Sequence, residues 1–445
     1  MPSRGPRVSG NLPGPVGKKI IDRDTRIMVT STKAGPIVAK RAKGSIIEDV
    51  DGNLIIDFFA GVGVQNVGHC HPKVVQAIKE QAEKFIHIAG TDYYYENQVE
   101  LAEKLAKTVP GRMPRKVFFT NSGSESVEAA LKVAKQATKR QTFVGFISAF
   151  HGRTMGSLGV TASKPVHREG FFPFMPGVYH IPYAYCYRCR YKQEYPDCGV
   201  WCAKILDEVY FDTFVPPNDV AAIVAEPIQG EGGFIVPPKE FLPILKRTAE
   251  KYGILYIDDE VQAGMGRTGR MWAIEHFGVV PDIITTAKAL GAGIPIGATI
   301  IDSKLDFDKS GRHSNTFGGN PIGAAAALAV LEIIEKEKLL ERTRKLGKKS
   351  IKRLREMQDD HDIIGDTRGL GLMLAHEFVK DKKSRAVNKE ARDKIVDLAL
   401  KNGLGVIGCG KSSIRYIPPL TIEENLLDKA WDILEGCIRT VEKQH

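Results

Sequence analysis

The chain has 445 residues, a formal net charge of +10 at pH 7, 43% hydrophobic residues and 26% charged residues. This composition is typical of a globular protein and excludes a fibrous or intrinsically disordered chain. The length allows two domains, or one large domain with a smaller companion. No run of about 18 apolar residues occurs in the sequence, so we expect no membrane-spanning helix and no membrane partner.

Residues 1–19 are rich in Pro, Gly and basic side chains, without the apolar core of a secretory signal. We expect this stretch to form an extended arm, and the protein to be cytoplasmic. Lys and Arg are interspersed with Asp and Glu along the chain. The basic balance therefore predicts solubility and anionic small-molecule substrates, and not nucleic-acid binding.

The first predicted element is a β-hairpin over residues 44–56. Its turn falls at Asp51-Gly52-Asn53, because an Asp-Gly pair between apolar runs favours a tight turn. A strand follows over 117–120, and then a helix over about 125–139 with apolar residues on one face. The turn between them, Ser122-Gly123-Ser124, predicts either a phosphate-binding helix start or a plain serine N-cap.

Further strands are predicted over residues 143–148, 220–225, 254–257 and 283–287, and a long helix over 322–337. Asp258, Asp259 and Glu260 follow the third of these strands, and Lys288 follows the fourth. In an open α/β sheet the carboxyl ends of the strands face the ligand crevice, so a carboxylate and an amine could meet there. A lysine can form an imine with an aldehyde cofactor, and a carboxylate can keep the nitrogen of its ring protonated.

Gly264, Gly266 and Gly269 match the G-x-G-x-x-G spacing of dinucleotide-binding loops. That pattern has to follow a strand immediately and open a helix. Here the glycines come several residues after the predicted strand, and Arg267-Thr268 is a poor helix start. We do not expect a dinucleotide site.

Residues 182–202 carry four of the seven cysteines, namely Cys186, Cys189, Cys198 and Cys202. Their C-x2-C-x8-C-x3-C spacing suggests a structural zinc or iron–sulfur site in a reducing compartment. Disulfides and four unligated thiols remain the alternatives. We assign the cluster no catalytic role.

The order of several motifs resembles the class III pyridoxal-phosphate aminotransferases, the group of ornithine and 4-aminobutyrate aminotransferases. The motifs are Ser-Gly-Ser, Phe-His-Gly-Arg, EPIQGE, DDEVQAGMGRTG, TTAKALGAGIPIGA and TFGGNP, and the resemblance covers about residues 20–440. It implies an α/β protein of PLP-dependent transferase fold type I, with a mostly parallel seven-stranded sheet. The expected parts are an N-terminal segment (1–60), a large cofactor-binding domain (61–330, with the Cys-rich insertion 182–202) and a small α/β C-terminal domain (331–445).

The resemblance also implies roles for individual residues. Lys288 would bond to pyridoxal 5′-phosphate, and Asp259 would pair with the nitrogen of its ring. The other expected cofactor contacts are Ser122, Gly123, Ser124, Phe150, Val261, Gln262 and Thr316, the last reaching the partner subunit's cofactor in a homodimer or higher oligomer. The expected substrate contacts are Val62, Arg153 for a distal carboxylate, Glu231 for neutralising that arginine, and Arg415 for the α-carboxylate, with Arg368 as a rival.

We therefore expect an aminotransferase that moves an amino group to a keto acid such as 2-oxoglutarate. The donor would be the ω-amine of 4-aminobutyrate, ornithine or a similar compound. Two alternatives stay open: an amino-acid racemase or epimerase that uses the same lysine, and a non-catalytic binding protein on the same fold.

Overall fold

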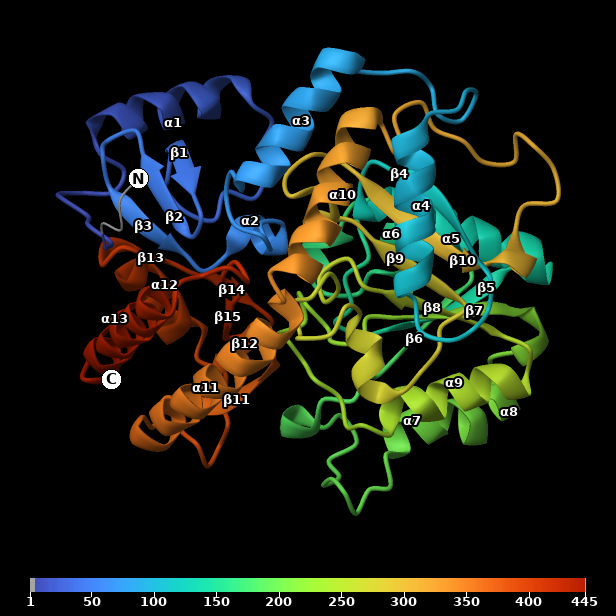
Figure 1. Cartoon of the computed structure of the whole chain (residues 1–445). Coiled ribbons are helices and arrows are strands. Elements are labelled where there is room, and N and C mark those ends of the chain that lie inside the picture. The colour runs from blue at the N-terminus through green and yellow to red at the C-terminus, as the bar shows by residue number, and fades with distance from the viewer. Residues whose placement is uncertain (1–4, 445) are drawn as a thin grey trace. The chain divides into compact units, whose positions relative to one another are not determined.

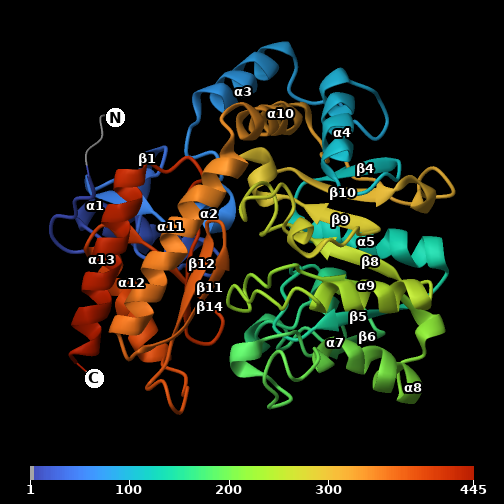
Figure 2. The same cartoon turned by 60° about the horizontal axis from the view of Figure 1, so that its bottom comes forward.

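The computed structural model describes residues 5–444, which divide into two compact units. One unit runs from Lys73 to Glu341; the other combines the chain up to Pro72 with the chain from Arg342 onward. Figures 1 and 2 show the elements of both units. We describe each unit by itself.

The Lys73–Glu341 unit is built on a seven-stranded sheet in the order β4-β10-β9-β8-β7-β5-β6. Neighbouring strands from β9 to β6 pair in parallel, whereas β10 is antiparallel to both β9 and β4. The strands are β4 (Arg115–Thr120), β5 (Thr142–Phe146), β6 (Val178–Ile181), β7 (Val220–Ala225), β8 (Leu255–Asp259), β9 (Ile283–Thr286) and β10 (Gly297–Asp302). The predicted fold class, with its mostly parallel sheet, is confirmed.

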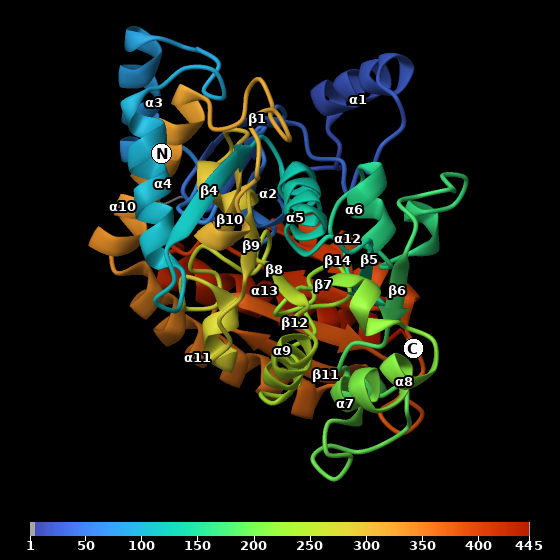
Figure 3. The same cartoon turned by 90° about the vertical axis from the view of Figure 1, so that its right-hand side faces the viewer.

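Helices cover both faces of this sheet, with α5 and α6 on one face and α9 on the other (Figure 3). All six residues of β7 are buried, as expected for a parallel strand covered on both faces. Val127, Ala130 and Ala134 of α5 pack in one core with β-strand residues such as Ile257. The helices are α3 (Pro72–Lys84), α4 (Glu96–Thr108), α5 (Gly123–Thr138), α6 (Met155–Val160), α7 (Trp201–Ile205), α8 (Phe211–Thr213), α9 (Phe241–Lys251) and α10 (Pro321–Lys336).

The second unit holds two four-stranded sheets, in the orders β1-β2-β3-β13 and β11-β12-β15-β14. Its strands are β1 (Ala39–Lys43), β2 (Ile46–Asp49), β3 (Leu54–Asp57), β11 (Ile364–Leu370), β12 (Met373–Phe378), β13 (Leu404–Gly405), β14 (Ile407–Cys409) and β15 (Ser413–Tyr416). Its helices are α1 (Pro15–Ile27), α2 (Ala60–Gly63), α11 (Leu339–Asp360), α12 (Lys389–Lys401) and α13 (Glu424–Glu442). Among residues 5–444, no helix is both long and apolar enough to span a bilayer.

The predicted hairpin is confirmed as the antiparallel pair β2–β3, with Ile47 opposite Ile55. Asp49 holds the turn, since its Oδ1 accepts hydrogen bonds from the backbone N–H of Asp51 at 2.9 Å and of Asn53 at 2.8 Å. Gly52 has a φ of +87°, a conformation in which a side chain would be strained.

The expectation of an extended arm is wrong for residues from Pro15 onward, which form helix α1. Pro15 starts the helix well, because its fixed φ suits the first turn and its missing N–H would have no helical partner there. The Asp51 carboxylate supplies the cap: its two oxygens each accept a hydrogen bond of 2.8 Å, from the N–H groups of Val16 and Gly17.

Asp51→Ala is therefore expected to loosen α1 while leaving the hairpin paired. A lost cap costs about 1 kcal/mol, so amide hydrogens in the first turns of α1 should exchange roughly fivefold faster. Hydrogen–deuterium exchange with mass spectrometry of the peptide over 12–28 measures this. Asp22→Ala, an exposed carboxylate on the same helix, is the control; equal exchange in both variants would show that Asp51 does not hold α1.

Candidate active site

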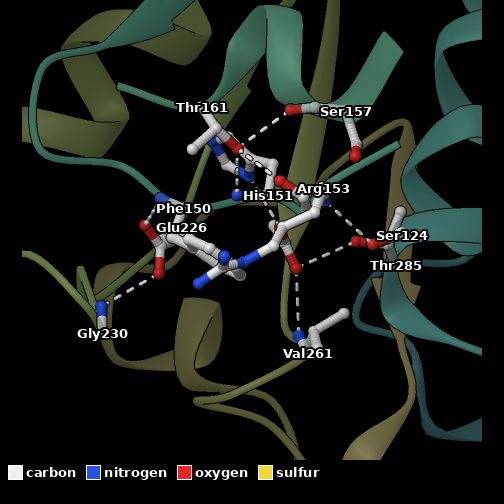
Figure 4. Close-up of polar contacts among 12 residues, drawn as sticks. Ser124, Phe150, His151, Arg153, Ser157, Thr161, Glu226, Gly230, Val261 and Thr285 are labelled. Atoms are coloured by element: carbon white, nitrogen blue, oxygen red, sulfur yellow. Dashed lines mark hydrogen bonds and ion pairs between the residues drawn. The ribbon is translucent and has the colours of Figure 1, made fainter. Parts of the chain in front are cut away.

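A buried carboxylate lies at the end of β8, in the middle of the large sheet. Asp259 is 4% exposed, and its Oδ2 lies 2.7 Å from His151 Nδ1. Its Oδ1 accepts hydrogen bonds of 3.1 Å from the N–H of Val261 and from Thr285 Oγ1 (Figure 4). These contacts come from three separate segments and fix the carboxylate in one orientation.

Charge reinforces the contact between Asp259 and His151. Burial by itself would lower the pKa of His151, but the hydrogen bond and the negative charge of Asp259, with that of Glu226, raise it above its ordinary value. The two carboxylates thus favour the charged form of the imidazole, which burial alone would disfavour.

Lys288 follows the neighbouring strand β9 and starts a short 3-10 helix over Lys288–Gly291. It has a φ of +32°, and the preceding Ala287 has φ −165° and ψ −123°. A side-chain-bearing residue in this region is strained, and such strain clusters at functional sites. Since β8 and β9 are adjacent and parallel, Lys288 and Asp259 leave the sheet at the same edge.

The Ser122-Gly123-Ser124 turn opens α5 and lies against Val261. Ser122 is the N-cap, and its side chain accepts a hydrogen bond from the N–H of Glu125 at 3.3 Å. A Cβ on Gly123 would lie 2.8 Å from Val261 Cγ1, so only glycine fits there. Both earlier interpretations of this turn are compatible with the geometry, because a capped helix start still presents N–H groups to an anion.

Two more glycines bring predicted site residues close to the backbone. A Cβ on Gly152 would lie 2.4 Å from Ser124 Oγ, and one on Gly230 would lie 1.8 Å from Gln262 Oε1. Ser124 Oγ also accepts a hydrogen bond of 3.2 Å from the N–H of Arg153. The turn before α5, the loop after β5 and the loop after β8 are therefore packed against one another.

The backbone of Phe150 is hydrogen-bonded to Glu226, which directly follows β7. Glu226 Oε2 accepts from the N–H of Phe150 at 3.0 Å, and its Oε1 accepts from the N–H of Gly230 at 2.9 Å (Figure 4). Burial raises the pKa of Glu226 to about 7, against the opposing charge of His151. This carboxyl group thus ties the Phe150 loop to the loop that carries Glu231.

A cluster of charged side chains surrounds Phe150. The guanidinium of Arg153 lies 5.8 Å from the centre of the Phe150 ring, and the His167 ring packs on Phe150 in a T-shaped arrangement with 5.6 Å between the ring centres. Lys164 Nζ lies 2.5 Å from Glu231 Oε1. Burial, followed by the charge of Arg153, lowers the pKa of His167, so this ring is neutral at neutral pH. Glu231 thus forms an ion pair with Lys164, a residue that the sequence analysis did not single out.

Asp258 and Glu260 flank Asp259 and are also buried. Successive side chains of a strand point to opposite faces of the sheet, so the side chains of Asp258 and Asp259 lie in different environments. Burial, and then the charges of Glu260 and Asp259, raise the pKa of Asp258 well above its usual range. Burial raises the pKa of Glu260 to about 8. The sequence analysis placed Asp258 and Asp259 directly after the strand. This is wrong, because they are the last two residues of β8 itself.

The other predicted substrate residues lie in the second unit. Val62 is in α2 with a φ of +63°, and Arg415 is a buried residue of β15. Arg368 is engaged by two carboxylates: Asp366 at 2.6 Å and Glu377 at 2.9 Å. A guanidinium that is already paired with two carboxylates is a poor receptor for a further carboxylate, which counts against Arg368 as the substrate contact.

Thr316 is exposed in the loop between β10 and α10. Asn315 anchors this loop, since its Nδ2 donates to Phe119 O at 2.8 Å. The neighbouring Phe317 is 59% exposed and lies 5.0 Å from the His87 ring.

The four cysteines of the insertion are close together. Burial, followed by the charges of the thiols of Cys186, Cys189 and Cys198, raises the pKa of Cys202 to about 12. None of the seven cysteines, all of which lie in the described part of the chain, forms a disulfide. Within residues 5–444, no group of three or more His, Cys, Asp and Glu side chains stands ready-made around a metal position. The structure therefore leaves the predicted metal site untested.

Three residues of the site had no assigned role in the sequence analysis: His151, Lys164 and Glu226. His151 and Glu226 belong to two recognised motifs, Phe-His-Gly-Arg and EPIQGE, and each lies in the segment that follows a strand. Their positions at the carboxyl ends of strands could have identified them as candidates. Lys164 lies in an unremarkable loop, and no local signal indicates its pairing with a residue 67 positions away.

Comparison with known proteins gives a consistent result. The sequence profile of the family described as aminotransferase class-III matches residues 28–438. A leucine/methionine racemase of Thermococcus litoralis is 41% identical, with 96% of each chain covered. A probable 4-aminobutyrate aminotransferase of Bacillus subtilis is also 41% identical, covering 90% of this chain and 93% of that protein.

Among solved structures, the omega transaminase of Pseudomonas jessenii in complex with PMP superposes with a TM-score of 0.89 at 27% identity. The match covers 95% of this chain and 98% of that one. The profile and both relatives thus extend over nearly the whole sequence. The chain belongs to the class III aminotransferase family, whose members use pyridoxal phosphate.

Proposed function

We propose that the chain is an aminotransferase that uses a small amine donor and a keto acid carrying a second carboxylate, such as 2-oxoglutarate. The observation that carries this proposal is the cationic cluster around Phe150. Arg153 and Lys164 bring two positive charges, and Glu231 brings one negative charge. The remaining positive charge would suit a distal carboxylate, which a small apolar amino acid lacks.

The residues around Asp259 fit pyridoxal phosphate. Because Gly123 has no side chain, the backbone at the start of α5 can lie against Val261. The N-terminus of this 16-residue helix suits a phosphate. Ser122, Gly123 and Ser124 would hold the phosphate, together with Thr316 from a second copy of the chain. Phe150 and Val261 would lie against the two ring faces, and Gln262 near the ring hydroxyl. When bound, the cofactor supplies an electron sink for the bond broken at the substrate carbon.

Within this site, each side chain has a defined task. Asp259, held by His151, would keep a proton on the ring nitrogen of the cofactor. Lys288 would hold the cofactor covalently at rest. As a free amine, its Nζ would act as the general base that takes the proton from the substrate carbon and as the general acid that delivers it to the cofactor carbon. Arg153 would bind the distal carboxylate of the keto acid, and Arg415 its α-carboxylate.

A second copy of the chain is part of the proposal. Thr316 is exposed, and apolar side chains around its loop are exposed as well: Phe317 at 59%, Tyr94 at 96% and Ile86 at 65%. Thr91 Oγ1 donates to Asn315 O at 3.2 Å, which joins the segment of Tyr94 to this loop. Covering these side chains in a homodimer would bury apolar area and let Thr316 reach the partner's cofactor.

The second candidate function is amino-acid racemisation, because a racemase and an aminotransferase are equally similar to the chain at 41% identity. In a racemase, the lysine would return the proton to the carbon from which it came. The two functions separate in one assay with purified protein. We expect glutamate to form from 2-oxoglutarate with a panel of amines, and enantiopure amino acids to keep their optical rotation without a keto acid. Racemisation without glutamate formation would refute the proposal.

Lys288→Ala is expected to abolish transamination. Removing the nucleophile and general base together should lower kcat by about 10³-fold or more. Initial rates of glutamate formation measure the change, with Lys239→Ala, an exposed lysine of the same unit, as the control. Activity of Lys288→Ala within tenfold of the wild type would remove Lys288 from the mechanism.

Asp259→Asn is expected to lower kcat about a hundredfold, the effect of losing one preorganised electrostatic contact. Asp258→Asn is the matched control: Asp258 is a buried carboxyl at the end of the same strand, and burial raises its pKa well above its usual range, so asparagine changes its charge less than it changes that of Asp259. Rates of both variants are compared at saturating cofactor. Equal losses in the two variants would indicate a general effect on folding.

Lys164→Met should raise the KM for 2-oxoglutarate about tenfold, which corresponds to about 1.4 kcal/mol of lost binding. The KM for pyruvate, which has no distal carboxylate, should stay within about twofold. Glu231→Gln changes the local charge in the opposite direction and should leave the KM for 2-oxoglutarate unchanged or lower. A parallel rise for both keto acids in Lys164→Met would contradict the assigned role.

A further inference from the structure

The four cysteines of the insertion surround a single small cavity. Cys186 lies in a 3-10 turn, Cys202 lies in helix α7, and Cys189 and Cys198 lie in the irregular chain between them. All four line a cavity of about 20 Å³, together with Arg190. Cysteines from different parts of the insertion thus line one cavity.

The size of the cavity distinguishes between the possible occupants. A volume of about 10 to 15 Å³ is enough for one water-sized sphere, so 20 Å³ accommodates a single ion. A cluster of several iron and sulfide atoms would need a much larger space. A single ion would therefore require the smaller rearrangement of the four cysteines, and an iron–sulfur cluster the larger one.

The chemistry of the ligands indicates which ion. Four thiolates in a tetrahedral arrangement prefer Zn²⁺ among the common divalent ions, and closed four-cysteine sites are structural. Four thiolates and one Zn²⁺ leave a net charge of −2. Arg190, on the wall of the same cavity, offsets part of that charge.

We propose that Cys186, Cys189, Cys198 and Cys202 bind one structural Zn²⁺ ion. On binding, the four thiol groups release four protons and form four Zn–S bonds, with no change of oxidation state. The thiols are not yet arranged at ligating positions in the described residues, so binding draws them inward around the cavity. The ion would fasten the turn at Cys186 to helix α7.

The site is independent of the proposed reaction, so its test does not rely on turnover. Elemental analysis of the purified full-length protein, after dialysis against metal-free buffer, should find about one zinc per chain. Cobalt-loaded protein, prepared after acid or chelator treatment, should show the sulfur-to-cobalt charge-transfer band and the visible bands of tetrahedral four-thiolate cobalt. Chelation should also lower the Tm of the wild-type protein.

Two variants locate the ligands. The double variants Cys186→Ser with Cys189→Ser, and Cys198→Ser with Cys202→Ser, should each lose the zinc and the cobalt bands. Cys70→Ser, an exposed cysteine in the other unit, should retain both. The result on wild-type protein stands even where a double variant fails to fold.

Three outcomes would overturn the proposal. The first is metal-free protein whose four thiols react with a thiol reagent and take up no cobalt. The second is disulfides among the four cysteines, found by peptide mapping without reduction. The third is iron with acid-labile sulfide in place of zinc.

Discussion

The site depends on one buried carboxylate whose orientation is fixed from three sides. Asp259 has almost no contact with solvent, and a buried charge is tolerated only when it is paired and hydrogen-bonded. His151 satisfies one oxygen, while Val261 N–H and Thr285 satisfy the other. The cost of burying this charge explains why the strand end, the loop after β5 and the loop after β8 must pack together. The proposed cofactor site is the product of that packing.

Sheet topology then determines what surrounds the carboxylate. Because β9, β8, β7 and β5 are parallel neighbours, the segments that follow them leave the sheet at the same edge. The segments after β9, β7 and β5 carry Lys288, Glu226 and Phe150, and Asp259 is the last residue of β8 itself. The glycines at 123, 152 and 230 remove the side chains that would keep the loops apart. Lys288 follows β9 in a tight turn with a positive φ, and this strained backbone conformation is typical of functional sites.

The elements that could be predicted from the sequence are those with a strong local signal. Strand β7 has the predicted bounds, and the Asp51-Gly52 turn forms as expected. Helix α1 was missed because its cap, Asp51, lies 34 residues or more away from the N–H groups that it holds. His151 and Asp259 are separated by 108 residues, and Lys164 and Glu231 by 67. Such pairings depend on the folded sheet and leave no local pattern, whereas the motifs themselves identified Asp259 and Lys288 as candidates.

The central claim is that Lys288 holds pyridoxal phosphate at a site steadied by Asp259. The most direct measurement is borohydride reduction of the cofactor-loaded protein, followed by proteolysis and mass spectrometry of the labelled peptide. The account predicts one pyridoxyl group per chain, located on Lys288. A label on another lysine, or protein that takes up no cofactor, would contradict it.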